Sequence, residues 1–213
     1  MKGLIISAGN IKNYKRLKDL ISNIDFEFIL CADGGIRHAI SLDRVPNAVI
    51  GDLDSTAKED LKYIDENSIQ VIKYPVEKDE TDTELAIEYL ISRRIKDITL
   101  IGGTGSRIDH TMANILLLHR LMIKGIDGRI IDEHNIIQIT DKCVNLRKKK
   151  DYNISIIPIS NDGIVVSLKG FYYPLENKRI QFGSTLGISN RIVNDIGIIN
   201  IIKGLALIIE SID

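Results

Sequence analysis

The sequence predicts an α/β fold in two parts: an N-terminal three-layer domain built on a parallel sheet, then a C-terminal antiparallel β-sandwich. Over residues 1–140, short β-branched runs alternate with segments of helical periodicity, which is typical of a parallel sheet covered by helices. After about residue 140 the helical period disappears, and short strand-like runs separated by turn signals follow one another. We therefore expect one domain at residues 1–140 and a second at residues 141–213.

The expected strands of the N-terminal domain are short and rich in aliphatic residues. They cover residues 4–7, 26–32, 48–50, 69–74, 98–101 and 129–132. Between some of these strands, apolar residues recur at intervals of three and four, which is the period of a helix with one buried face. The helices expected on this pattern cover residues 14–21, 84–91 and 107–123.

In the C-terminal domain the apolar runs are short, and turn residues separate them. The strands expected there cover residues 153–159, 164–168, 178–182, 198–202 and 206–209. Asn161-Asp162-Gly163, Lys169-Gly170 and Lys203-Gly204 are typical turn sequences. This spacing of strands and turns predicts an antiparallel sandwich or partial barrel.

Composition excludes several classes of protein. The chain has 213 residues, 44% of them hydrophobic, so it can bury a core and is not expected to be disordered. A net charge of −1 argues against a nucleic-acid binder that relies on a broad basic surface. No apolar run approaches the roughly 20 residues that span a bilayer, and the N-terminal run is too short for a signal peptide. Cys31 and Cys143 suggest no disulfide framework, so we expect a cytoplasmic protein.

Ligands of such a sheet bind beyond the carboxyl ends of its strands, where this chain carries four polar clusters. The first cluster is Asp33-Gly34-Gly35, which could be an ordinary strand-to-helix turn. The second is Gly51-Asp52-Leu53-Asp54-Ser55. Its two carboxylates, two residues apart at a strand end, can face one Mg²⁺ ion, although Asp54 or Ser55 could instead cap a helix.

The third cluster is Lys78-Asp79-Glu80-Thr81-Asp82, at the start of an expected helix. Thr81 and Glu84 match a capping box, and acidic residues suit the first turn of a helix. Capping needs a single oxygen, however, and three crowded carboxylates exceed that need. Their mutual repulsion would be relieved by a cation, so we interpret this cluster as functional.

The fourth cluster is the glycine-rich run 102–110, which reads GGTGSRIDH and leads into the longest expected helix. Backbone N–H groups at such a turn can bind an anion, and Arg107 can bind phosphate oxygens with two hydrogen bonds. In the alternative, purely structural interpretation, Ser106 caps the helix, Asp109 is an acidic residue of its first turn and His110 is a structural residue. Capping alone does not account for so many glycines and charges.

The four clusters together predict transfer of phosphate groups from a nucleotide to a small molecule. This chemistry needs carboxylates for a metal ion, cations that balance developing charge, and backbone donors that position the phosphates.

At these residues the sequence resembles the thiamine pyrophosphokinase family. The matching strings, in order, are ADGG at 32–35, GDLDS at 51–55, KDETD at 78–82 and GGTGSRIDH at 102–110. Two later segments, 168–175 and 186–190, resemble the family's thiamine-side segments. The resemblance implies an N-terminal α/β domain that binds nucleotide and Mg²⁺ and a C-terminal β-sandwich that binds thiamine and serves dimerisation. It further implies a homodimer with active sites between subunits. It also implies that the thiamine hydroxyl attacks the β-phosphorus of ATP, giving thiamine diphosphate and AMP.

The resemblance implies a role for each matching residue. The residues expected to act in catalysis are Asp52, Asp54, Asp79 and Asp82, of which Asp52, Asp54 and Asp82 would hold Mg²⁺ directly or through water. The residues expected to bind ATP are Asp33, Gly34, Gly35, Lys78, Thr81, Gly103, Gly105, Arg107, Asp109 and His110. The residues expected to bind thiamine are Ser189, Asn190, Tyr172 and Phe182.

The thiamine side departs from some relatives, which place a tryptophan against thiamine, because this chain contains none. An aromatic face attracts the cationic thiazolium ring, so Tyr172, Tyr173 and Phe182 are the candidates for that contact. Each of them could instead be a core residue of the sandwich.

Two other functions remain open at this point. A metal-dependent nucleotidyl or nucleotide-sugar transferase could use Asp52 and Asp54, but it would not explain the third and fourth clusters together. A non-catalytic sensor of nucleotide or thiamine could share the same scaffold. We expect no nucleic-acid partner and no membrane partner for any of the three.

Overall fold

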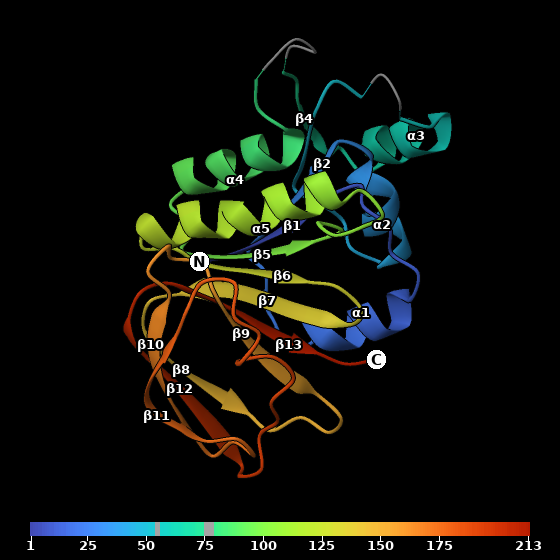
Figure 1. Ribbon diagram of the computed structural model, residues 1–213. Helices are drawn as coiled ribbons and strands as arrows, with labels where there is room; N and C mark the ends of the chain where they lie inside the picture. The colour runs from blue at the N-terminus through green and yellow to red at the C-terminus, as the bar shows by residue number, and fades with distance from the viewer. Residues whose placement is uncertain (54–55, 75–78) are drawn as a thin grey trace. The chain divides into compact units, whose positions relative to one another are not determined.

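The structure is a computed structural model that describes residues 1–53, 56–74 and 79–213. It divides into two compact units, Met1–Glu133 and His134–Asp213 (Figure 1).

In the described part of the first unit, six parallel strands form a sheet in the order β4-β3-β2-β1-β5-β6. The strands are β1 (Lys2–Ile6), β2 (Phe28–Ala32), β3 (Ala48–Ile50), β4 (Gln70–Ile72), β5 (Asp97–Ile101) and β6 (Asp127–Ile131). The chain runs outward from β1 to β4 and then returns across the sheet to β5. The order therefore reverses between β1 and β5, and a pair of neighbouring strands at such a reversal is the usual ligand position in an open α/β sheet.

Helices connect the strands and complete a three-layer unit. They are α1 (Tyr14–Ile21), α2 (Ile36–Ser41), α3 (Lys58–Glu66), α4 (Asp82–Ser92) and α5 (Ile108–Ile123), with a short 3₁₀ turn η1 (Asp33–Gly35). Because parallel crossovers are right-handed, the reversal between β1 and β5 puts the helices that follow β1 and β2 on one face and α4 and α5 on the other. Figure 1 shows this arrangement, with α4 and α5 lying side by side.

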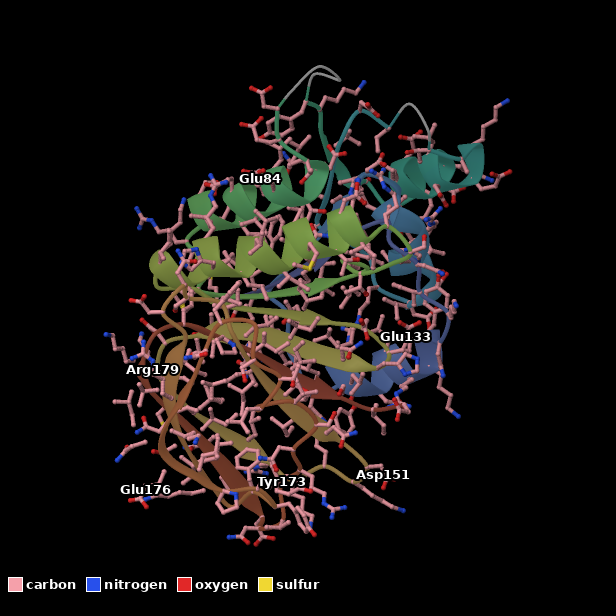
Figure 2. The ribbon with its side chains drawn as sticks, viewed as in Figure 1. Glu84, Glu133, Asp151, Tyr173, Glu176 and Arg179 are labelled. Atoms are coloured by element: carbon pink, nitrogen blue, oxygen red, sulfur yellow. The ribbon has the colours of Figure 1, made fainter. Side chains whose placement is uncertain are left out.

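Ion pairs join α4 to α5 across that face. Arg120 on α5 pairs with Glu84 and Glu88 on α4, and Lys124 pairs with Glu88 at 3.2 Å. Figure 2 labels Glu84 on α4. These pairs are partly exposed, so each is expected to contribute only about 0.2–1 kcal/mol.

Two helices of this unit start at side-chain caps. Thr81 accepts a hydrogen bond from the amide of Glu84 at the start of α4, as the capping-box pattern predicts. Asn13 accepts one from the amide of Arg16 at the start of α1. The buried Glu133, just after β6, accepts from the amides of Lys12 and Asn13 and so fixes where α1 begins. Glu133 is labelled in Figure 2.

The second unit consists of two antiparallel sheets. One has the order β7-β13-β9, formed by β7 (Asn135–Thr140), β13 (Ala206–Ser211) and β9 (Asn153–Pro158). The other has the order β11-β10-β12-β8, formed by β11 (Leu175–Ile180), β10 (Ile164–Lys169), β12 (Ile196–Lys203) and β8 (Cys143–Arg147). A single apolar core draws on both sheets, including Ile156, Ile208, Val166 and Ile199, so the unit is a sandwich.

The predicted fold class is confirmed, with differences at the element boundaries. The predicted helix at residues 14–21 and the predicted strand at 48–50 have the bounds of α1 and β3. The prediction included neither β7 nor β8, and it placed the domain boundary after residue 140, whereas the first unit ends at Glu133. The predicted strand at 178–182 lies too late, because β11 ends at Ile180 and Phe182 is in the following turn.

Among the described residues, the structure contains no helix whose length and apolar character would let it cross a bilayer.

Of the two glycines in the first cluster, only Gly35 lies where a side chain would not fit. A Cβ at Gly35 would lie 1.9 Å from the carbonyl oxygen of Ile6, the last residue of β1. A Cβ at Gly34 would meet the side chain of Ala8 at 3.5 Å, an ordinary contact. The glycine pair therefore lets η1 pack against the end of β1.

We expect Gly35→Ala to lower the free energy of unfolding by about 3 kcal/mol or more, because the added methyl overlaps a backbone atom that cannot move alone. The matched variant Gly34→Ala is expected to stay within about 1 kcal/mol of wild type. Urea denaturation followed by circular dichroism measures both. Equal stability of the two variants would contradict the assignment.

Candidate functional site

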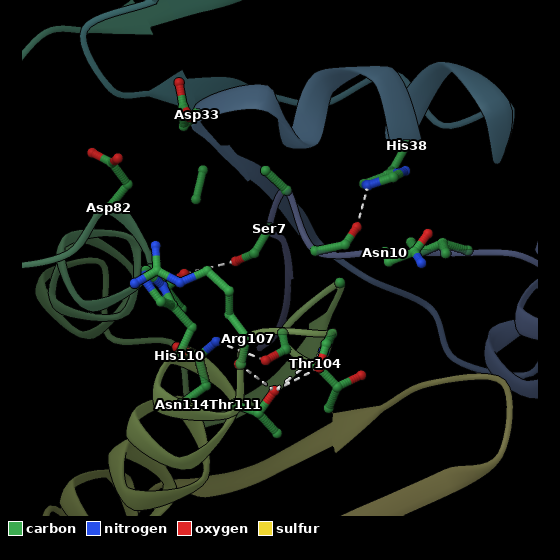
Figure 3. Close-up of a pocket in the computed structure, with 18 of the residues that line it drawn as sticks. Ser7, Asn10, Asp33, His38, Asp82, Thr104, Arg107, His110, Thr111 and Asn114 are labelled. Carbon is green, nitrogen blue, oxygen red and sulfur yellow. Dashed lines mark hydrogen bonds between the residues drawn. The ribbon is translucent and has the colours of Figure 1, made fainter.

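The first unit contains a cavity of about 810 Å³ at the carboxyl ends of its strands. Loops after β1, β2 and β5 and the start of α4 line it, so the cavity lies where the strand order reverses between β1 and β5. Figure 3 shows most of the lining residues. The described lining is formed by Ser7, Ala8, Gly9, Asn10, Ile11, Tyr14, Ala32, Asp33, Arg37, His38, Glu80, Thr81, Asp82, Thr83, Gly102, Gly103, Thr104, Gly105, Ser106, Arg107, His110, Thr111 and Asn114.

Two glycines let the loops after β1 and β5 meet backbone to backbone. The amide of Gly9 donates to the carbonyl of Gly102 at 2.9 Å. A Cβ at Gly9 would lie 2.3 Å from that oxygen, and one at Gly102, where φ is 64°, would lie 2.2 Å from the carbonyl oxygen of Ser7. No side chain fits at either position, so the two loops meet through their main chain.

Polar side chains of lining residues hold these loops in place. Ser7 and Thr83 share a hydroxyl hydrogen bond of 2.9 Å, which joins the end of β1 to α4. Asn114, buried on α5, donates to the carbonyl of Gly103 at 2.7 Å. Thr104 donates to the carboxylate of Asp132 at 2.9 Å. Each of the loops is therefore bonded to a helix or strand, and buried hydrogen bonds of this kind favour a single arrangement.

The first and third acidic clusters reach the cavity. Asp33 lies there with φ at 48°, and its Oδ1 atom is buried without a hydrogen-bond partner among the described residues. Asp82, the first residue of α4, lines the cavity from another element (Figure 3). A buried carboxylate oxygen without a donor is costly unless a ligand supplies one, so Asp33 indicates a ligand with a positive charge or a donor.

Other predicted acids are placed differently. Asp52 follows β3 and is half-buried, and it is not among the described lining residues. Asp79 is exposed in the turn before α4. Asp54 and Lys78 lie outside the described residues. Within the described ranges no three His, Cys, Asp or Glu side chains are gathered closely enough to hold a metal ion.

The fourth cluster supplies Arg107, one of the two arginines in the described lining of the cavity. Arg107 is the N-cap residue of α5, without a capping side-chain bond, and its guanidinium donates to both carboxylate oxygens of Asp109. This pair raises the pKa of Arg107 and lowers the pKa of Asp109. Ser106, the alternative cap, also lines the cavity. Arg107 and His110 thus face the cavity from the start of a long helix, where an anion is stabilised.

Of the predicted thiamine residues, Asn190 is buried and its amide group is already bonded within its own unit. Its Oδ1 accepts from the amides of Tyr173 and Arg191, and its Nδ2 donates to the carbonyl of Tyr173. Ser189 is exposed with φ at 56°, and its amide donates to the hydroxyl of Ser155. Asn190 therefore fixes the turn that carries Tyr172 and Tyr173.

The candidate aromatics are exposed and are not core residues. Tyr172, Tyr173 and Phe182 are 51%, 63% and 60% exposed. The rings of Tyr172 and Tyr173 meet edge to face at 4.8 Å, and the guanidinium of Arg191 lies 4.2 Å from the Tyr172 ring centre. One face of Tyr172 is thus already covered by a cation, which leaves Tyr173 and Phe182 more open to a second one.

Sequence reasoning missed the loop after β1 and three lining residues on α1 and α2. Residues 7–11 line the cavity, and so do Tyr14, Arg37 and His38. The rule that selected the other clusters, a position directly after a strand, applies equally to Ser7-Ala8-Gly9-Asn10 and could have found it.

His38 is a buried histidine that touches this loop. Its Nε2 lies 2.7 Å from the carbonyl of Gly9 and its Nδ1 lies 2.8 Å from the hydroxyl of Tyr14. Because a carbonyl can only accept, Nε2 carries the proton and Nδ1 accepts from Tyr14. Burial lowers the pKa of His38 and Arg37 adds to this effect, while the hydrogen bonds of Gly9 and Ala8 and the charge of Glu133 oppose it.

The described lining of the cavity thus combines carboxylates, two arginines, a helix start and exposed main chain. Such a set can bind an anionic ligand together with a cation, as a nucleotide polyphosphate requires.

Comparison with known proteins gives the same family over both units. A family model for the thiamin pyrophosphokinase catalytic domain matches residues 17–130, and one for the thiamin pyrophosphokinase vitamin B1 binding domain matches residues 136–205. Thiamine pyrophosphokinase from Bacillus subtilis (strain 168) is 34% identical over 217 residues, covering 100% of both chains. Thiamin pyrophosphokinase 1 from Caenorhabditis elegans is 25% identical over 180 residues, covering 78% of this chain and 72% of its own.

Solved structures agree. The crystal structure of the Bacillus subtilis thiamine pyrophosphokinase superposes with a TM-score of 0.90 at 30% identity and full coverage of both chains. The yeast thiamin pyrophosphokinase structure, at 19% identity, has a TM-score of 0.80 over 99% of this chain and 86% of its own, and it supports the fold alone.

We expect the stability of the protein to fall as pH drops below about 6.5, the ordinary pKa of histidine. The pKa of His38 is lower in the folded chain, so the unfolded chain takes up the proton first and is stabilised relative to the folded chain. Urea midpoints measured between about pH 7.5 and pH 5.5 should decline more steeply in wild type than in His38→Gln. Equal slopes would contradict the expectation.

Proposed function

The chain belongs to the thiamine pyrophosphokinase family, and from that premise we propose that it moves a diphosphoryl group from ATP to thiamine in the cavity of the first unit. In this reaction the thiamine hydroxyl oxygen forms a bond to the β-phosphorus of ATP. The bond from the β-phosphorus to the oxygen that bridges the α- and β-phosphates breaks, and AMP leaves with that oxygen. The observation that carries the proposal is the joint presence of Asp33, Asp82 and Arg107 around one cavity.

The nucleotide would bind along the start of α5. Arg107 balances charge on the phosphates, and two hydrogen bonds to Asp109 orient its guanidinium. Gly103 and Gly105 permit close approach of the phosphates to the main chain, with Thr81 and His110 beside them. In this proposal Gly34 and Gly35 act indirectly, by shaping the turn that carries Asp33, and Lys78 remains an expected ATP contact.

The carboxylates fit Mg²⁺ by their chemistry. Asp33 has a buried oxygen without a donor, and Asp82 lines the same cavity, so the described residues offer hard oxygen ligands on two elements. Asp52 and Asp54 would complete the set from the loop after β3. When bound, the ion would neutralise charge on the transferred phosphates. Asp52, Asp54, Asp79 and Asp82 are the candidates for accepting the proton of the thiamine hydroxyl.

The second unit would bind thiamine. Ser189 offers an exposed hydroxyl, and Tyr173 and Phe182 offer open aromatic faces to the thiazolium ring, with Tyr172 beside them. Asn190 would contribute mainly by shaping this surface, because its amide is bonded to Tyr173 and Arg191.

A homodimer with active sites between subunits belongs to the proposal. Ile108, Met112 and Leu116 recur every four residues on α5 and are 68%, 50% and 57% exposed, next to the residues of α5 that line the cavity. An apolar stripe of this kind is a typical protein interface.

We also propose a cytoplasmic location, in keeping with the free thiols of Cys31 and Cys143.

Incubation with Mg-ATP and thiamine tests the function, and we expect release of AMP that depends on thiamine. Asp82→Asn removes one charge from the cavity and should lower kcat by about 100-fold or more. Asp65→Asn on α3 is the matched control, because this exposed residue lies outside the cavity, and it should keep wild-type kcat.

AMP release without thiamine would favour a nucleotidyl transferase or hydrolase, and binding without turnover would favour a sensor. Circular dichroism melting separates lost catalysis from lost folding in Asp82→Asn, since Asp82 also occupies the first turn of α4.

The dimer is tested by light scattering after gel filtration, with an expected mass about twice the chain mass of 23.9 kDa. Met112→Glu combined with Leu116→Glu should halve this mass, because two charges in an apolar interface cannot be desolvated cheaply. Val45→Glu, at a residue 54% exposed outside the stripe, should leave it unchanged. A wild-type monomer that is fully active would refute this part of the proposal.

A further inference from the structure

The loop after β1, residues 7–11, lines the cavity and carries no charged side chain. Within the described ranges, the amides of Ala8 and Asn10 donate to no protein group. Two carbonyls of the loop are bonded instead to α2: Arg37 donates to Ala8 at 2.8 Å and His38 donates to Gly9 at 2.7 Å. Figure 3 shows His38 beside the loop that runs from Ser7 to Asn10.

The hydrogen bonds to the carbonyls of Ala8 and Gly9 matter because the proposed ligand of the cavity is a polyphosphate. A carbonyl oxygen carries partial negative charge, so a carbonyl turned toward a polyphosphate repels it, while an amide N–H attracts it. A carbonyl that is bonded to α2 is kept from turning toward the ligand. The loop then presents its amides with little reorganisation when the nucleotide arrives, which lowers the cost of binding.

His38 can do this only if its own orientation is fixed, and Tyr14 fixes it. The Tyr14 hydroxyl donates to Nδ1, and the two rings lie 5.8 Å apart at 43°. His38 is buried, whereas Arg37 is exposed, so the bond to Gly9 is the better shielded of the two. Tyr14, His38 and Gly9 therefore form a chain of hydrogen bonds that runs from α1 through α2 to the cavity wall.

We propose that His38 and Tyr14 are positioning residues for the nucleotide, which act through Gly9 to hold residues 7–11 in the shape that binds ATP. The proposal rests on the proposed function of the cavity. In this proposal neither residue takes part in proton transfer or touches the reacting atoms. Substituting either one should therefore change the affinity for the nucleotide and not the rate of the chemical step.

The test compares three variants. Tyr14→Phe removes the bond that orients the imidazole. His38→Leu removes the donor to Gly9, and His38→Gln restores an N–H group at a similar distance from the backbone. Tyr63→Phe on α3, outside the cavity, is the matched control for Tyr14→Phe.

We expect Tyr14→Phe to raise KM for ATP about threefold to fivefold, the effect of one hydrogen bond, with kcat and KM for thiamine within about twofold of wild type. His38→Leu should raise KM for ATP about tenfold or more, and His38→Gln should recover most of that loss. Thermal melting of each variant shows whether the fold is intact.

The proposal is overturned if the three variants keep the wild-type KM for ATP, or if His38→Gln is as impaired as His38→Leu. A loss of kcat in step with stability, without a change in KM, would assign the residues a purely structural role and overturn it too. Titration calorimetry with Mg-ATP gives Kd for each variant without turnover. If wild type binds ATP but releases no AMP, the proposed function fails while these Kd values still decide the positioning role.

Discussion

The position of the cavity follows from the pairing of β1 with β5. These two parallel strands are neighbours in the sheet although most of the first unit's chain separates them, and the chain leaves them toward opposite faces. The chain segments that follow these two loops therefore diverge, which opens the space that Asp33, Asp82 and Arg107 line. The bond from Gly9 to Gly102 holds the two loops together at the bottom of that space. The positions of the groups assigned to the nucleotide therefore depend on the pairing of β1 with β5.

The fold class could be predicted from the sequence because each unit has a distinct apolar period. Parallel strands buried on both faces, such as β1 and β2, read as continuous apolar runs, and long helices such as α5 show a clear stripe. The strands β7 and β8 were missed because alternating burial along five or six residues gives a weak signal. The family, recognised from the order of four short strings, is confirmed by the family models and the relatives.

The candidate site could be predicted in part, and there is a physical reason why some of its residues were found from the sequence and others were not. Clusters that combine charge with glycine stand out in a sequence, and members of three of them, including Asp33, Thr81 and Arg107, line the cavity. The loop at residues 7–11 lacks acidic side chains and works through its main chain, so residue types alone do not reveal it. His38 is harder still, because its role depends on burial and on partners from α1 and the β1 loop, which only the folded chain brings together.

The two cysteines differ in exposure, which leaves the folded chain with a single thiol that is open to labelling reagents. Cys31 is buried in β2, and burial strongly raises the pKa of its thiol, so the thiolate that reacts with maleimides does not form there in the folded chain. Cys143 is exposed at the start of β8, on the edge of the four-stranded sheet. A fluorescent dye would thus attach to the sandwich alone in the unmodified protein, far in sequence from every group assigned to the nucleotide. Its emission could report on events at that sheet without any engineered substitution.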